Sequence, residues 1–160
     1  MHFIYTSLPS HVMQTFLPYP SLALSVTCLD YRRLGKQRVE AMQLVNSTLK
    51  LERGEPVKGW ANHPARIMWI GYMDALKLYH NMCIAEWIKR GYNNTMQFYD
   101  LPDTEIEMPH WLGDPRVHDS HKSNLLRKDF SFYSQYNWNL PTNIDYYWPV
   151  GKQTNVDHMA

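Results

Sequence analysis

The stretch from Asp30 to Leu51, DYRRLGKQRVEAMQLVNSTLKL, constrains the fold most, because it has the periodicity of one long amphipathic helix. At about 100° per residue, its apolar residues fall in one broad arc, namely Tyr31, Leu34, Val39, Ala41, Met42, Val45 and Leu49. Polar residues of both signs gather on the opposite side, namely Asp30, Arg33, Lys36, Gln37 and Glu40. We therefore predict one helix that buries its apolar side against the rest of the chain.

The first turns of this helix carry an excess of cations, namely Arg32, Arg33, Lys36 and Arg38. Cations near a helix N-terminus oppose the helix dipole, at a cost of roughly a few tenths of a kcal/mol each. A bound polyanion, such as the phosphate backbone of a nucleic acid, would offset that cost. The alternative interpretation is a solvated face on which these cations form ion pairs with carboxylates.

Charge is unevenly distributed along a chain that is nearly neutral overall. The 160 residues carry a formal net charge of +1, which argues against a nonspecific nucleic-acid coat protein. Residues 32–66 nevertheless hold eight Lys or Arg against three acids, whereas residues 96–119 hold one Arg against six acids. A compact fold could thus present a basic face despite its near neutrality.

The two cysteines, Cys28 and Cys83, are too few for a disulfide scaffold, so we expect reduced thiols and a cytoplasmic protein. The sequence has no run of 18 apolar residues and no signal-peptide pattern at its start, so we expect no membrane association. The length suits a single domain, and we expect a monomer.

Two further helices are predicted downstream. One runs from Pro64 to about Arg90, after a cap at Asn62 or His63, and is apolar nearly all round. The other runs from about His121 to Lys128, with a cap at Asp119 or Ser120 and a continuation to Tyr136 as an alternative. Because strand-like alternation is almost absent, we predict an all-α fold: one compact domain of about three main helices, with irregular loops and an aromatic C-terminal tail. Its predicted limits are residues 13–150, between a flexible extension (1–12) and a disordered tail (151–160).

Five ordered blocks resemble the pyrimidine-dimer DNA glycosylase (endonuclease V-type) family: RLGKQRVE, NHPARIMWIGY, IKRGY, PHWLGDPRVHDSHKSNLLRKD and YYWP. The resemblance extends over residues 13–150 and is closest to bacterial and phage relatives that begin with MQTFLP, as this chain does from Met13. It implies a compact all-α domain of about three helices, in agreement with the periodicity.

The resemblance implies an activity on double-stranded DNA. Members excise the base of a cyclobutane pyrimidine dimer and then cleave the strand at the abasic site, so we expect a DNA glycosylase with AP-lyase activity on a damaged or modified pyrimidine. A neutral amine attacks C1′ of the damaged nucleotide and forms a Schiff base, while a carboxylate assists sugar opening and β-elimination. We expect no metal and no cofactor.

The identity of the amine is open. In the characterised family enzyme it is the α-amine of a Thr that is exposed when the initiator Met is removed. This sequence begins Met1-His2, and its family-like start lies at Met13. The candidates are therefore the amine of Met1, the amine of Met13 if translation starts there, and Lys36, whose pKa neighbouring cations would lower.

The carboxylate is also open, because the YRxL motif aligns Arg33 with the family's catalytic Glu. Asp30 and Glu40 are the acids on the same face of the predicted helix. We predict that one of them takes the carboxylate role. The alternative is that each forms an ion pair with Arg33 or Lys36.

By analogy with the family, ten residues are predicted to contact DNA: Arg32, Arg33, Arg38, His63, Arg66, Trp111, His118, His121, Lys122 and Arg127. Structural roles compete at three of them. Arg38 lies inside the apolar arc and could form a buried ion pair, and His63 could be a helix cap. Trp111 could stack on a flipped base or anchor a loop to the core.

Two rival functions remain. One is a nucleic-acid-binding protein that has lost the chemistry, which Arg33 at the catalytic Glu position favours. The other is an enzyme that acts on modified nucleobases without lyase activity. The spacing of His118 and His121 also suits two metal ligands on one helix face, but no third ligand is defined, so ordinary hydrogen-bonded histidines are the expectation.

Overall fold

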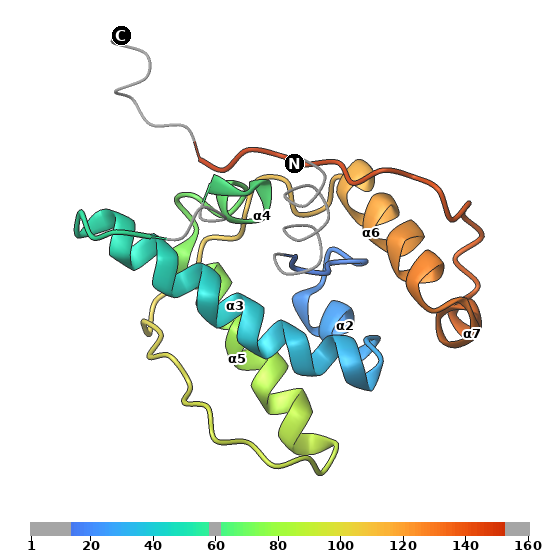
Figure 1. The fold of residues 1–160 in the computed structure, drawn as a ribbon, viewed down its shortest axis with the longest axis horizontal. Helices are drawn as coiled ribbons and strands as arrows, with labels where there is room; N and C mark the ends of the chain where they lie inside the picture. Colours follow the sequence, from blue (N-terminus) through green and yellow to red (C-terminus); the bar gives the residue numbers. More distant parts are fainter. Residues whose placement is uncertain (1–13, 58–61, 153–160) are drawn as a thin grey trace, which may run out of the picture.

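The computed structural model describes residues 14–57 and 62–152, and within these ranges it is all-α, without a strand. This confirms the predicted fold class. The helices are drawn in Figure 1, and their bounds are α2 (Leu22–Thr27), α3 (Tyr31–Glu52), α4 (Pro64–Ile67), α5 (Met73–Lys89), α6 (Pro115–Lys128), α7 (Phe130–Tyr133) and the short 3₁₀ helix η2 (Ser134–Tyr136). None of the helices in these ranges has the length and hydropathy that a membrane span requires.

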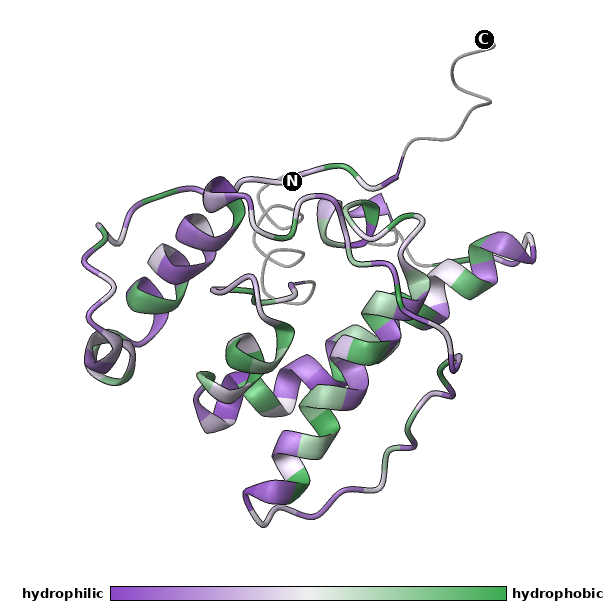
Figure 2. Ribbon diagram, turned by 180° about the vertical axis from the view of Figure 1, so that it is seen from behind, coloured by the Kyte–Doolittle hydropathy of each residue, from purple (hydrophilic) through white to green (hydrophobic). Residues whose placement is uncertain are grey.

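Helix α3 matches the predicted helix almost residue for residue and packs across α5 at the centre of the domain. Its inner side buries Leu34, Ala41, Leu44 and Val45, and hydrophobic segments lie where the two helices cross in Figure 2. Each fully buried Leu or Val stabilises the fold by about 1.5–3 kcal/mol. The packing of α3 against α5 thus fixes the position of α3 and of the side chains on its outer side.

The predicted division of α3 into an apolar and a polar side is only partly right. Tyr31 and Val39, placed in the apolar arc, are 53% and 38% exposed. Gln37 and Glu40, placed on the solvent side, are 1% and 6% exposed. The reason is that an extended N-terminal segment, residues 14–20, packs on the polar side of α3, so this helix is buried from two directions. We call this segment the arm.

The predicted helix from Pro64 to Arg90 is wrong as one element, because the chain breaks between α4 and α5. Gly71 turns the chain there with a φ of +86°, a conformation that L residues with a side chain rarely adopt. The C-terminal segment occupies the break: Gly151 N–H donates to Ile67 O at 3.1 Å, and Lys152 N–H donates to Ile70 O at 2.7 Å. These carbonyls therefore bond to the tail instead of continuing a helix.

The third helix starts earlier than predicted, at Pro115, and its cap is Asp114, whose carboxylate accepts from Arg116 N–H. Neither of the predicted caps, Asp119 and Ser120, is used, and Ser120 lies inside the helix. The end at Lys128 agrees with the sequence. The continuation to Tyr136 is two separate short helices, since Asp129 caps α7 anew.

The aromatic C-terminal segment packs back on α6, as expected (Figure 1). Asn124 Nδ2 donates to Ile144 O at 3.0 Å, and Tyr147 N–H donates to Ser120 Oγ at 3.2 Å. Gly151 and Lys152, which we expected in a disordered tail, are bonded to the break described above, so the packed segment extends at least to residue 152. The predicted extension (1–12) and residues 153–160 lie outside the described residues.

Candidate active site

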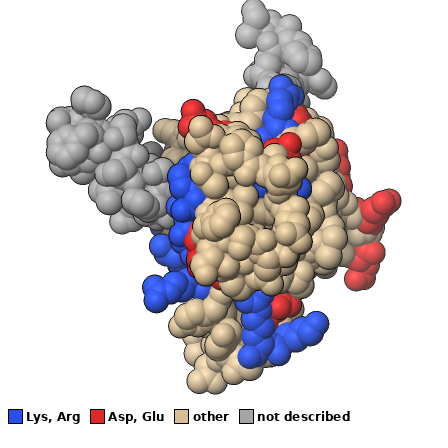
Figure 3. Space-filling model, turned by 90° about the vertical axis from the view of Figure 1, so that its right-hand side faces the viewer, with Lys and Arg blue, Asp and Glu red and all other residues tan. Residues whose placement is uncertain are grey.

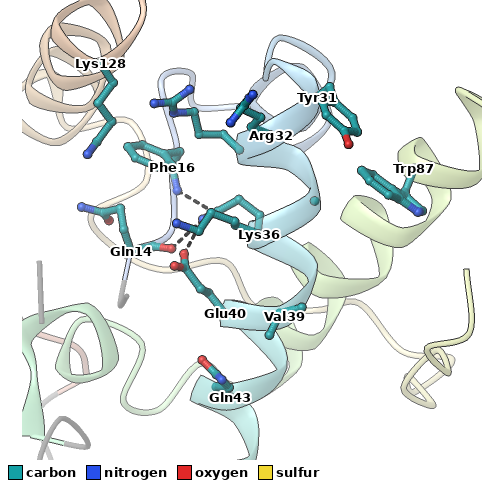
Figure 4. Close-up of a pocket in the computed structure, with 13 residues that line it drawn as sticks. Gln14, Phe16, Tyr31, Arg32, Lys36, Val39, Glu40, Gln43, Trp87 and Lys128 are labelled. Atoms are coloured by element: carbon teal, nitrogen blue, oxygen red, sulfur yellow. Dashed lines mark hydrogen bonds between the residues drawn. The ribbon is translucent and has the colours of Figure 1, made fainter. Parts of the chain in front are cut away.

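A groove of about 1000 Å³ runs over the exposed side of the N-terminal half of α3 (Figure 4). One wall is formed by the arm and the end of α6, and the other by aromatic and small residues of α3 and α5. The lining residues are Gln14, Phe16, Tyr31, Arg32, Arg33, Gly35, Lys36, Gln37, Val39, Glu40, Gln43, Trp87 and Lys128. It contains both the predicted lysine candidate, Lys36, and the glutamate candidate, Glu40.

The arm has no strand partner, so its backbone groups are satisfied by side chains from the helices around it. Gln37 brackets it from α3: its Nε2 donates to Gln14 O at 2.7 Å, and its Oε1 accepts from Phe16 N–H at 2.9 Å. Tyr79 of α5 donates to Phe16 O at 3.0 Å. These bonds fix Gln14 and Phe16 as one wall of the groove.

Two buried histidines of α6 hold the next residue of the arm. His121 Nδ1 accepts from Leu17 N–H at 2.8 Å. His118 Nε2 accepts from Gly113 N–H at 2.8 Å, so its Nδ1 carries the proton and donates to Leu17 O at 2.7 Å. Burial lowers the pKa of both imidazoles, that of His121 to about 3, so both are neutral near pH 7. Neither lines the groove, and their predicted contact with DNA stays a prediction.

Glu40 lies at the bottom of the groove, next to the start of the arm (Figure 4). Its Oε1 accepts from Gln37 Nε2 at 3.0 Å. Burial raises the pKa of this carboxyl to about 8, while the Lys36 ammonium and the Gln14 N–H act in the opposite direction. Both protonation states are therefore accessible near neutral pH, which suits a group that gives and takes a proton.

Asp30, the other predicted carboxylate, is the N-cap of α3. Its Oδ2 accepts from the N–H of Arg32 and of Arg33, at 3.2 and 3.5 Å, and from Arg33 Nη1 at 3.2 Å. Its Oδ1 accepts from the Tyr133 hydroxyl, whose oxygen accepts in turn from Asp30 N–H. Asp30 does not line the groove. Its carboxylate oxygens are occupied in joining α3 to α7.

Cations of two helices converge on the groove. Arg32, Arg33 and Lys36 come from α3, and Lys128 comes from the end of α6. Desolvation lowers the pKa of Lys128, and the positive charges of Arg33, Arg127 and Lys36 lower it further. In Figure 3, Lys and Arg gather along the left edge and lower end of the face shown, and the largest group of acids lies at the right edge. The groove is therefore attractive to an anion.

Lys128 is the groove cation that the sequence interpretation missed. Its neighbour Arg127 was predicted to contact DNA, but Arg127 bonds to Thr142 O and to the Asn124 side chain. Arg127 and Lys128 are adjacent in the sequence but lie on different sides of α6. Periodicity alone does not show which of these sides faces α3.

Arg38 lies against the aromatic wall, with its guanidinium 4.0 Å from the centre of the Trp87 ring. It donates to Gly35 O and to Asn94 Oδ1, both at 3.3 Å. These contacts take the place of the buried ion pair that the sequence offered as an alternative. A role in DNA binding stays a prediction.

Four other predicted DNA contacts lie outside the groove. His63 caps α4 by accepting from Ala65 N–H at 3.0 Å, and Arg66 of the same helix is 9% exposed. Trp111 is 2% exposed and donates to Met68 O at 2.7 Å, which anchors its loop to the core. The Lys122 ammonium lies 5.3 Å from the centre of the Tyr19 ring. The described residues contain no group of three His, Cys, Asp or Glu that could hold a metal ion.

Comparison with known families gives one match: residues 13–100, more than half of the chain, match the family model of pyrimidine dimer DNA glycosylases. The chain belongs to this family. The matched segment includes α2 to α5 and starts one residue before Gln14, so it contains the arm and the carboxylate of the groove. Family membership supports a pyrimidine-dimer DNA glycosylase function in general, with DNA as the substrate. No curated protein and no solved structure matches the chain.

Proposed function

We propose that this protein is a bifunctional DNA glycosylase that excises a pyrimidine lesion from double-stranded DNA and then nicks the strand by AP-lyase chemistry, through a Schiff base. The observation that carries this proposal is the position of Glu40: a nearly buried carboxyl with a pKa of about 8, in a cation-lined groove, beside the arm. Family membership supplies the substrate class.

Glu40 is the proton carrier in this scheme. A neutral amine attacks C1′, the C1′–N1 bond breaks, and the base leaves with the bonding electrons and takes up the proton that the attacking nitrogen loses. Protonated Glu40 donates its proton to O4′ as the sugar opens and the C1′ imine forms. The resulting carboxylate then removes a proton from C2′, and β-elimination breaks the C3′–O3′ bond. One group with a pKa near 8 can serve both steps.

We assign the amine to residue 13, in a chain that begins there. The backbone of Gln14 is held by Gln37, and its N–H lies close enough to Glu40 to lower the pKa of that carboxyl. An α-amine on the preceding residue would thus start next to the carboxyl. An α-amine has an ordinary pKa of about 7.7–8.0, so a large fraction of it is neutral near pH 7.5.

The cations of the groove position the DNA in this proposal. Arg32, Arg33, Lys36 and Lys128 contact phosphates on both sides of the nucleotide that enters the groove. In this proposal the protein acts as a monomer.

The test uses labelled duplexes that carry a thymine dimer or an abasic site, with and without sodium borohydride. Proteins that begin at Met1 and at Met13 are compared. We expect a nick and a reduced covalent adduct with the protein that begins at Met13, and neither with its Glu40→Gln variant. Salt-sensitive DNA binding without a nick or an adduct from either protein would contradict the proposal and favour a binder without catalytic activity.

A further inference from the structure

Behind the arm, three buried polar groups meet between the arm, α6 and the C-terminal segment. Four buried side-chain atoms in the described residues have no hydrogen-bond partner, and three of them are Gln14 Nε2, His121 Nε2 and the Tyr146 hydroxyl. The His121 and Tyr146 rings touch edge to face, with centroids 5.7 Å apart. Burial raises the pKa of the Tyr146 hydroxyl to about 12, and the neighbouring Gln14 amide is the largest influence in the opposite direction. Buried polar groups in native proteins are nearly always bonded, so a partner for this cluster is expected.

The bonds that the three side chains do make determine what each can still offer. His121 Nδ1 accepts from Leu17 N–H, so in the neutral imidazole Nε2 carries the proton and is a donor. Gln14 Oε1 accepts from Thr15 N–H at 2.8 Å, so the remaining end of this amide is its NH2 group, which is also a donor. Tyr146 keeps its proton near pH 7. The cluster thus has donors from three side chains and one acceptor atom, the Tyr146 oxygen, so its members cannot satisfy one another.

Charge around the cluster indicates which small acceptor fits. None of the three donors is cationic. Besides burial, charges of both signs act on the pKa of Tyr146, since Arg127 lowers it and Glu40 raises it. A buried anion without a paired cation is costly. A water molecule is uncharged, can accept from two of the donors and can donate to the phenol oxygen. A buried water typically makes about three hydrogen bonds, which here is one for each side chain.

Both ends of such a link are fixed in the fold. Tyr146 is held by its neighbours, because Ile144 N–H and Tyr147 N–H donate to serine hydroxyls of α6, at 3.0 and 3.2 Å. At the other end, the backbone carbonyl of Gln14 accepts from Gln37 of α3, while the Gln14 side chain points away from that helix (Figure 4). A water between these ends would therefore connect the C-terminal segment to the first described residue of the arm.

We propose that Gln14, His121 and Tyr146 bind one water molecule, which joins the start of the arm to α6 and the C-terminal segment. Through this link the amine of residue 13 is positioned against Glu40. The inference rests on the proposed function, which assigns the reacting amine to that residue. Gln14 is then held on two sides, through its backbone by α3 and through its side chain by the water. Tyr146 is a positioning residue, because it does not line the groove and acts on the reaction through Gln14.

The test uses Tyr146→Phe, which removes the hydroxyl and keeps the ring, in whichever of the two proteins compared above is active. We expect the single-turnover nicking rate on an abasic duplex to fall about 10- to 100-fold, because a displacement of about 1 Å at a reacting group can cost this much. Duplex binding should be unchanged. The matched control is Tyr147→Phe, which removes the next hydroxyl of the same segment. Its ring lies 4.3 Å from the Arg116 guanidinium, outside the cluster, so this variant should have wild-type activity.

A double-mutant cycle separates a shared link from general damage to the fold. Gln14→Met removes the amide, and Tyr146→Phe added to it should cost little further activity, because both changes act through the same water. Denaturant unfolding verifies that each variant folds. Three results overturn the inference and leave the proposed function standing: additive losses, wild-type activity of Tyr146→Phe, or weaker DNA binding of that variant with an unchanged rate.

Crystals of the protein grown with sodium bromide identify the bound species. We expect a water at hydrogen-bond distance from all three side chains. An anomalous bromide peak at this position, or no density there, overturns the inference. Wild-type protein that neither nicks DNA nor forms an adduct overturns the proposed function and, with it, the positioning of the amine, even where the crystals contain the water.

Discussion

The N-cap and the third turn of α3 each bury one carboxyl, and the two carboxyls have different surroundings. Asp30 and Glu40 are almost equally buried, at 7% and 6% exposed. Asp30 is surrounded by donors: two backbone N–H groups, a guanidinium and a tyrosine hydroxyl. Glu40 has one side-chain amide donor and the Gln14 N–H, and it faces a groove. The many donors around Asp30 give it a structural role, whereas burial with fewer donors raises the pKa of the Glu40 carboxyl and leaves it available for chemistry.

The largest expected difference between the two carboxyls is in catalysis: Glu40→Gln should lose activity. The amide has the same shape and still accepts the bond from Gln37, but it cannot transfer a proton. We expect the single-turnover rate on an abasic duplex to fall by about 10²–10⁴-fold. Asp30→Asn is the matched control and should keep most of its activity per folded molecule. Inactive, folded Asp30→Asn beside active Glu40→Gln would reverse the assignment.

The pH dependence comes next. The folded-state pKa of Glu40, about 8, exceeds the ordinary glutamate pKa of 4.5, so the native state binds more protons than the unfolded state between these values. The free energy of unfolding should therefore fall as pH rises from about 4.5 to 8, by up to about 1.4 kcal/mol per pH unit from this group.

Denaturant titrations of the wild type and of Glu40→Gln across this pH range isolate that contribution, because only the wild type has the titrating carboxyl. The rate of sugar opening should also fall above pH 8, as the protonated form is lost. Parallel stability curves for the two proteins would contradict the raised pKa.

A smaller effect is expected for Asp30, and it concerns the stability of the fold. Asp30→Ala removes the cap of α3 and leaves the Tyr133 hydroxyl without its acceptor, so we expect about 2 kcal/mol less stability, measured by denaturant unfolding. Asp30→Asn keeps a capping oxygen and should lose less. A variant Asp30→Ala as stable as the wild type would show that the cap does not stabilise α3.

The smallest effect concerns the cations around the third turn. The logarithm of the DNA-binding constant falls as the logarithm of the salt concentration rises. Lys128→Ala should make this slope less negative by about 0.9, because one phosphate contact is lost. The control is Lys77→Ala, since Lys77 lies over the Tyr99 ring outside the groove. Equal slopes for Lys128→Ala and the wild type would remove Lys128 from the DNA contacts.

The fold class and α3 could be predicted because both rest on local periodicity. The break at Gly71 could not, because its cause is Lys152, which lies 81 positions along the chain (152 − 71) and whose Cβ would be 2.5 Å from a Cβ at residue 71. The periodicity of residues 64–90 contains no information about the C-terminal segment, whose N–H groups bond to the carbonyls of Ile67 and Ile70.

The candidate site was predictable in part. Glu40 and Lys36 were identified from α3 alone, but Asp30 had equal standing, because the sequence does not show that Tyr133 reaches its carboxylate. Gln14 and Lys128 were missed, since their place in the groove depends on how the arm and α6 pack against α3. The exposure of Tyr31 was hidden for a similar reason, because its spacing is that of a core residue.

The bonds between the arm and α6 have a consequence for synthesis of the protein. Leu17 is separated by 104 residues from His121, and Asp30 by 103 residues from Tyr133. A chain that emerges N-terminus first therefore makes the arm, Gln37 and Glu40 early but still lacks His121 and Tyr133, which complete their support. The groove closes around its carboxyl only when α6 and α7 have left the ribosome, so a truncated product carries the reactive groups without a site in which to use them.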